Sequence, residues 1–228
     1  MRRLLQLGLL LFLAAGPLQG ASVIDRVVAT VNGHPILQSD WDLAVRSEAF
    51  LSHRPLEGLT AADQRATLDR LIDQELIRQQ TKGTEAAAIP PAELQKEIQE
   101  IRAQMPAAAT DAGWRSALQR YGLTASDLAD RLAAQWQILS FTEQRLRPSV
   151  HIDRDSIESY YRDTLLPELL RQGAQPAPLV EVSPRIEELL SQQRVDNLLT
   201  AWLQDLRRQS DIRIETENSA SARELDQR

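Results

Sequence analysis

Two short β-rich segments stand near opposite ends of an otherwise helix-forming chain, and they limit what the chain can fold into. Residues 23–31 (VIDRVVATV) lead into Asn32-Gly33, and residues 34–37 continue with apolar character. Asn-Gly between apolar segments predicts a type I′ hairpin, because that turn needs positive φ at both central residues. Residues 212–215 (IRIE) alternate like a strand. Since a lone hairpin is marginal in water, we expect the C-terminal strand to join it in one small sheet.

The segments between these strands are predicted to be helical, which makes the fold class mainly α. Gly is scarce at 9 of 228 residues, and helix-forming Ala, Leu, Gln, Arg and Glu are abundant. Apolar residues recur at helical spacing in seven segments, which are approximately residues 40–51, 60–82, 94–105, 114–121, 124–146, 156–170 and 184–209.

Local residue chemistry predicts where these helices begin and end. We expect N-caps at Ser39 or Asp40, at Thr60, at Thr124 or Ser126, and at Ser183 ahead of Pro184. Gly83 is expected to end the second helix. The buried faces of the two longest helices are predicted to comprise Leu128, Leu132, Trp136, Leu139 and Leu146 in one, and Ile186, Leu189, Leu190, Val195, Leu198, Leu199, Trp202 and Leu206 in the other.

The N-terminus has the pattern of a secretion signal. Arg2 and Arg3 precede an apolar run over residues 4–15, and small residues follow at 20–22. The run is shorter than the roughly 20 residues that a membrane-spanning helix needs. A short buried helix or an uncleaved anchor is the alternative. The expected organisation is a signal peptide at 1–21, a helical domain at 22–148, a linker helix and Pro-rich connection at 149–182, a returning helix and strand at 183–215, and a disordered tail at 216–228.

Composition and motifs argue against several classes of function. The chain has no Cys, which excludes disulfides, thiol catalysis and thiolate metal sites, and its net charge of -6 argues against nucleic-acid binding. His34, His53 and His151 show no metal-ligand spacing, and no nucleotide-binding or serine-nucleophile motif occurs. We therefore expect no enzyme activity, no metal and no cofactor, and no stable membrane insertion because no other long apolar run occurs.

Several segments resemble one family. Residues 24–40 (IDRVVATVNGHPILQSD) are similar to the opening of the SurA family of periplasmic chaperones, whose pattern is D-R-(V/I)-V-A-x-V-N followed by an apolar pair and S-(D/E). Residues 68–77 resemble the second helix of that family. Residues 91–101 and 123–146 fit the rest of its N-terminal domain, and residues 201–214 resemble its C-terminal helix and strand.

One difference from that family concerns catalysis. SurA-like proteins commonly carry parvulin-type prolyl isomerase domains before the C-terminal helix, and such a domain needs a β-sheet and several glycines. Only a helix and a Pro-rich linker are predicted between Pro148 and Ser183. The resemblance therefore implies a chaperone body that lacks the isomerase and has no isomerase activity.

The resulting hypothesis is a periplasmic holdase for unfolded or partly folded exported proteins, including outer-membrane protein precursors. Aromatic side chains offer large contact areas, and the candidate client-binding residues are Trp41, Phe50, Trp114, Tyr121, Tyr160 and Tyr161. For each of these residues, the alternative interpretation is that its side chain packs in the core. The sheet edge near Pro35 is a further candidate, because it is free to pair with an extended client strand. A non-catalytic adaptor or subunit of a cell-envelope assembly is the alternative function, and a homodimer formed by exchange of the terminal elements is a further hypothesis.

Overall fold

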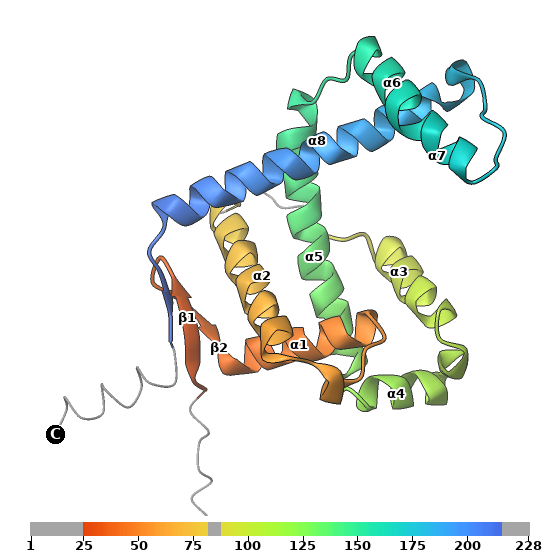
Figure 1. Ribbon diagram of the computed structural model, residues 1–228. Coiled ribbons are helices and arrows are strands. Elements are labelled where there is room, and N and C mark those ends of the chain that lie inside the picture. Colours follow the sequence, from red (N-terminus) through yellow and green to blue (C-terminus); the bar gives the residue numbers. More distant parts are fainter. Residues whose placement is uncertain (1–24, 82–87, 216–228) are drawn as a thin grey trace, which may run out of the picture.

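The two ends of the described chain meet in one three-stranded antiparallel sheet (Figure 1). The computed structural model describes residues 25–81 and 88–215. Strand β1 (Val27–Val31) lies between β2 (His34–Leu37) and β3 (Ile212–Ile214). The predicted sheet is confirmed. The signal peptide expected at 1–21, the helix stop at Gly83 and the tail at 216–228 lie outside the described residues.

The β1–β2 turn follows the predicted type I′ chemistry. Asn32 has φ of 51° and Gly33 has φ of 80°, so both central residues occupy the left-handed region. Strand β2 is an edge strand, as expected from Pro35, which lies opposite Thr30 in the register. Asn32 also fixes the other partner, because its side-chain oxygen accepts a 2.9 Å hydrogen bond from the backbone N–H of Asp211 next to β3.

The helices occupy the segments between the strands. They are α1 (Gln38–Leu51), α2 (Ala61–Gln80), α3 (Pro91–Ala103), α4 (Asp111–Gln119), α5 (Ala125–Leu146), α6 (Arg154–Tyr160), α7 (Leu166–Arg171) and α8 (Leu179–Gln209). Short 3₁₀ turns lie at Leu56–Gly58, Pro106–Ala108 and Arg147–Ser149. A π-helical turn at Tyr161–Leu165 joins α6 to α7, where one continuous helix was predicted.

Two of the four predicted helix caps are confirmed, and two are wrong. The hydroxyls of Thr60 and Thr124 accept the backbone N–H of Asp63 and Asp127, and each carboxylate accepts the N–H of its Thr in return. Helix α1 instead begins after Leu37, so neither Ser39 nor Asp40 is its N-cap. Asp40 sits in the first turn, where its carboxylate accepts the N–H of Leu37.

The start of α8 also differs from the prediction. The helix begins at Leu179 and continues through Pro184, so Ser183 is an internal residue and not its N-cap. The hydroxyl of Ser183 donates a 2.7 Å hydrogen bond to the carbonyl of Leu179. Proline removes a single backbone donor from a long helix at this position, and the helix continues on both sides of it.

Buried apolar residues form two clusters. The sheet-side core joins β1, β2, α2 and α8 through Val28, Ala29, Val31, Ile36, Leu68, Ile72, Leu76 and Leu206. The α4-side core joins the end of α1 to α4 and α5 through Phe50, Ala108, Trp114, Ala117, Leu118, Leu123, Leu128 and Leu132. Helix α3 has no buried residue of its own and packs its apolar face on the second cluster.

Helix α8 connects the sheet to a distant part of the molecule (Figure 1). From its C-terminal end at β3 it crosses α2 and α5, and Trp202 meets Phe141 of α5 with ring centroids 6.2 Å apart. Its N-terminal end extends beyond α5 and packs against α6. The fold therefore consists of a body with two cores and a projecting helical segment.

Candidate functional site: an exposed apolar arm

The projecting segment comprises α6, the π-helical turn, α7, residues 172–178 and the first part of α8. We call residues 154–190 the arm and the other described residues the body. All residues of the arm are described, and Ile186 is its single buried residue, with 4% exposure. Apolar side chains that are partly buried line its helices instead, and they are Ile157, Tyr160, Tyr161, Leu165, Leu166, Leu169, Leu179, Val182 and Leu190. The arm is thus apolar but has almost no closed core.

The large apolar side chains that are most exposed gather in and beside this arm. Among the described residues, the exposed large apolar side chains are Val180 (80%), Leu170 (65%), Leu139 (54%) and Leu189 (41%). The first two and Leu189 belong to the arm, while Leu139 belongs to α5, which α8 crosses. Leu139 and Leu189 were predicted to be buried by helical periodicity, and that prediction is wrong because no other element of the described chain covers these faces.

A few specific contacts hold the arm in place. The hydroxyl of Tyr161 donates a 2.7 Å hydrogen bond to the carbonyl of Ala177, which ties the π-helical turn to the segment before α8. Arg147 at the end of α5 forms an ion pair with Glu188 of α8. These contacts position the arm without covering its apolar side chains.

Charged side chains surround the apolar ones. Arg154 pairs with Glu158 at 2.8 Å, and Arg162 pairs with Asp163 at 2.8 Å. The hydrogen bond from the Arg162 guanidinium holds the pKa of the Asp163 carboxyl below its usual range, so this pair stays ionised near neutral pH. Apolar surface ringed by ionised groups is typical of a surface that binds other proteins while the molecule remains in solution.

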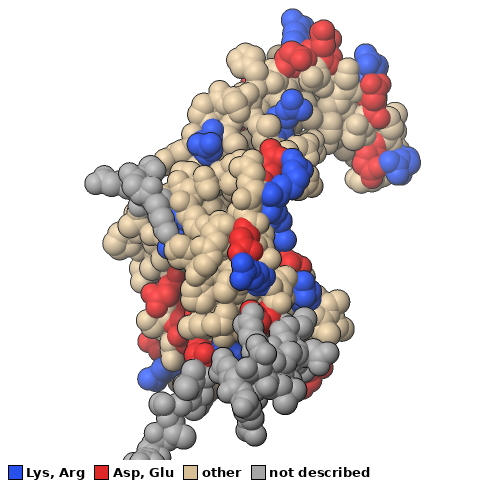
Figure 2. Space-filling view, turned by 90° about the vertical axis from the view of Figure 1, so that its left-hand side faces the viewer, with Lys and Arg blue, Asp and Glu red and all other residues tan. Residues whose placement is uncertain are grey.

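The arm stands away from the body and leaves a concave flank beneath it (Figure 2). The face seen in Figure 2 carries basic and acidic side chains next to one another, with no extended field of one sign. Such mixed charge provides no basic stripe on this face for a nucleic-acid backbone.

The six aromatic candidates fall into different environments. Phe50 (1% exposed) and Trp114 (7% exposed) are buried, and Phe50 meets the rings of Trp114 and Tyr121 edge-on at 5.7 and 5.4 Å. Trp41 packs beside the sheet-side core, and its indole N–H donates a 2.9 Å hydrogen bond to the carbonyl of Gln64. The structure brings three of the candidates together as part of a core.

Tyr160 and Tyr161 are the two candidates that lie in the arm, and both are partly buried. Sequence reasoning missed Leu170 and Val180, which are more exposed than either tyrosine. The available signal was their position on both sides of the Pro-rich residues 173–178. These residues interrupt the helical structure and leave two helix ends with few neighbours. The candidates predicted from sequence were all aromatic, so these aliphatic side chains were not among them.

The described residues contain no cluster of three or more His, Cys, Asp or Glu side chains with the geometry of a metal site. Within the same ranges, no helix is both long enough and apolar enough to cross a membrane.

Comparison with known proteins defines the class. Residues 3–140 match the model of the SurA-like N-terminal domain, a non-catalytic module of a chaperone-type periplasmic family. This match covers more than half of the chain. A comparison with curated proteins gives no match.

The chain therefore belongs to the family of proteins with a SurA-like N-terminal domain. The resemblance seen in residues 24–40 and 68–77 is confirmed by this match. The arm begins after the matched residues end, so the family match covers most of the body and leaves the arm to be interpreted from its own structure.

Proposed function

We propose that the protein is a periplasmic holdase that binds unfolded exported polypeptides, including outer-membrane protein precursors, through the apolar surface of its arm. The observation that carries this proposal is the exposure of Leu170, Val180 and Leu189 in one projecting segment. Membership of a chaperone-type family supports the same function.

The physical reason is the hydrophobic effect. An unfolded chain exposes apolar side chains, and each Å² of apolar surface removed from water contributes about 25 cal/mol. The arm keeps its apolar side chains accessible because α6, α7 and the start of α8 have too few neighbours to bury them. Clients that cover this surface are stabilised in solution without a specific sequence, which is the requirement for a holdase. Tyr160 and Tyr161 are the aromatic candidates that this proposal retains at the client surface.

The aggregation of a denatured porin tests the proposal. The mature protein should suppress light scattering at near-stoichiometric ratio, and the double variant V180S/L189S should suppress it much less because two exposed apolar contacts are lost. The variant Q193S/Q204S is the matched control, since it places two serines at exposed positions of the same helix outside the arm. Equal suppression by the two variants would contradict the role of the arm. Absence of suppression by the wild type, together with one tight native partner, would instead favour the adaptor or subunit of an envelope assembly.

We also propose that the protein lacks prolyl isomerase activity. Residues 149–182 are all described and form helices and a connecting segment with no strand, which supports the absence of a parvulin domain from that position. An Ala-Pro peptide assay should give the uncatalysed rate. A clear acceleration by the pure protein would overturn this part of the proposal.

A further inference from the structure

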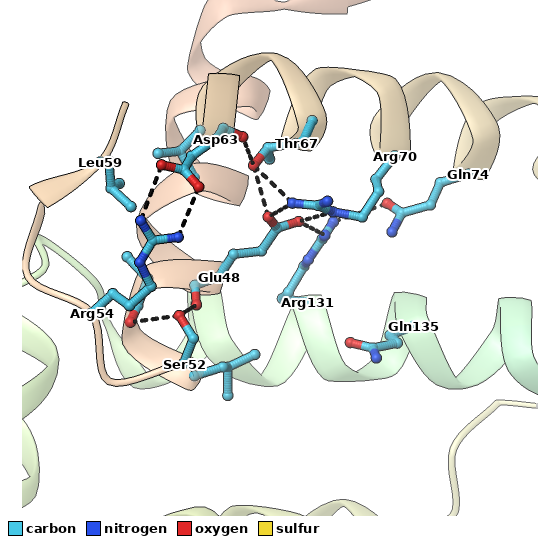
Figure 3. Close-up of a pocket in the computed structure, with 14 residues that line it drawn as sticks. Glu48, Ser52, Arg54, Leu59, Asp63, Thr67, Arg70, Gln74, Arg131 and Gln135 are labelled. Atoms are coloured by element: carbon cyan, nitrogen blue, oxygen red, sulfur yellow. Dashed lines mark hydrogen bonds and ion pairs between the residues drawn. The ribbon is translucent and has the colours of Figure 1, made fainter. Parts of the chain in front are cut away.

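A pocket of about 670 Å³ opens in the body between α1, α2 and α5 (Figure 3). Its volume lies in the range of sites that hold small molecules. The apolar part of its lining comprises Val45, Ala49, Leu51, Leu59 and Ala66. The charged part of the lining comprises Glu48, Arg54, Asp63, Arg70 and Arg131.

Glu48 is already saturated by groups from α2. The Thr67 hydroxyl donates a 2.7 Å hydrogen bond to its Oε2, and Arg70 donates to both carboxylate oxygens. On the opposite side of the pocket, Arg54 forms a two-pronged pair with Asp63, with distances of 2.8 and 3.0 Å. Both acidic groups of the pocket therefore have an arginine partner of their own.

Arg131 is the cation of the pocket that has no carboxylate of its own, because the Glu48 carboxylate that it approaches is also the partner of Arg70. Its side chain rises from α5 into the pocket with 15% exposure (Figure 3). One Nη donates a 2.9 Å hydrogen bond to the neutral amide of Gln74, and the other approaches Glu48 at 3.4 Å. The other N–H groups of Arg131 have no acceptor among residues 25–81 and 88–215. Burial lowers the pKa of the guanidinium, the charge of Arg70 lowers it further, and the charge of Glu48 acts in the opposite direction.

The charge balance identifies the side from which an anion approaches. The pocket holds three arginines and two carboxylates, which leaves one positive charge. A second pocket on the other side of Arg131 holds Asp40, Glu75, Asp127 and Asp130 against Arg78 and Arg131, so it repels anions. A single excess charge matches a monoanion, and the planar guanidinium matches a carboxylate.

From these observations we infer that the pocket binds a carboxylate joined to an apolar group, with Arg131 as its anion partner and the apolar lining residues in contact with that group. A small apolar carboxylic acid and the C-terminal residue of a polypeptide share this chemistry. The site lies in the body and does not depend on the holdase function proposed for the arm.

Titration calorimetry tests the inference with N-acetyl-leucine as the probe and N-acetyl-leucinamide as its neutral counterpart. The acid should bind to the full mature chain, and the amide should bind at least about tenfold more weakly because it cannot form the charge-assisted bond. A short peptide ending in leucine, with a free or an amidated C-terminus, separates the two sources. Binding of the free-acid peptide alone identifies a chain end as the ligand, and binding of N-acetyl-leucine alone identifies a small acid.

Three variants locate the binding in this pocket. R131Q should weaken binding of the acid about tenfold or more, and A66L should abolish it by filling the pocket without altering any charge. R162Q is the matched control, because it removes an exposed arginine of the arm that is paired with its neighbour Asp163. Since R131Q could lower stability, A66L and thermal melting of each variant separate loss of the site from unfolding. Failure of both acid and peptide to bind, equal binding of acid and amide, or unchanged binding by folded R131Q and A66L would each overturn the inference.

Discussion

The body and the arm use similar apolar residues in opposite ways. In the body, Ile72, Leu76 and Phe50 are almost fully buried because several helices and the sheet surround them. In the arm, Leu170, Val180 and Leu189 remain exposed. Of its two short helices, α6 is the one that packs extensively against α8. The comparison teaches that apolar periodicity alone does not produce a core. It produces a core only where enough elements converge, and elsewhere it leaves apolar side chains exposed to solvent.

The body and the arm therefore contribute differently to stability and to the proposed binding. The body supplies the free energy of folding and holds α8 at its C-terminal end through the sheet-side core. The arm contributes little buried area and is free to gain burial by contact with another chain. Mutations in the two regions should therefore have separate consequences.

Removing one buried ring from the body should have the largest effect on stability. Phe50→Ala takes away a side chain that is 1% exposed and in contact with Trp114 and Tyr121, so it should lower the free energy of unfolding by about 3–5 kcal/mol. Tyr160→Ala in the arm should cost less than about 1 kcal/mol. Urea denaturation measures both. Equal losses of unfolding free energy would show that the arm is part of the cooperative core. That result would contradict the distinction between the body and the arm.

Loss of a helix cap should have a smaller effect that again differs between the regions. Thr60→Ala removes the hydroxyl that accepts the N–H of Asp63 at the start of α2, and should cost about 1 kcal/mol of global stability. Asp153→Ala removes the equivalent acceptor for Ser156 at the start of α6. We expect it to speed amide exchange in α6 while leaving the unfolding midpoint nearly unchanged. A shift of that midpoint as large as the one for Thr60→Ala would contradict the distinction.

Acid should weaken the caps of the body progressively. The hydrogen bond from Arg54, together with those from Thr60, lowers the pKa of Asp63, and hydrogen bonds from Thr124 lower the pKa of Asp127. Because these pKa values are lower in the folded state, the stabilisation is fully present above the unfolded Asp value of about 3.9 and is lost as the pH falls below it. Urea midpoints measured from pH 6 to pH 2 should decline as the pH falls below about 3.9. The midpoint of the Asp63→Asn variant should decline less steeply over the same pH range. Parallel declines would show that Asp63 does not contribute.

The features that sequence predicted correctly depend on neighbouring residues. Asn32-Gly33 dictates its own turn, and Thr60 and Thr124 find their partners three residues later. One long-range feature was also predicted: the C-terminal strand was expected to join the hairpin because a lone hairpin is marginal in water, and β3 does pair with β1.

The features that sequence missed depend on distant residues. Periodicity places Leu139 and Leu189 on apolar stripes, but it does not show that no other helix arrives to cover them. Ser183-Pro184 has the chemistry of a helix start, yet α8 begins at Leu179. The pocket at Arg131 joins residues of α1, α2 and α5, and its contact with Glu48 spans 83 residues of sequence. No local pattern marks such a pairing.

Hydrogen exchange of the protein with and without an unfolded porin tests the central claim most directly. The free protein should exchange faster in α6 and α7 than in β1 and α2, because the arm has almost no closed core. On addition of the porin, protection should rise in α7 and in the first part of α8, while β1 and α2 remain unchanged. Protection confined to the body, with no change in the arm, would contradict the account.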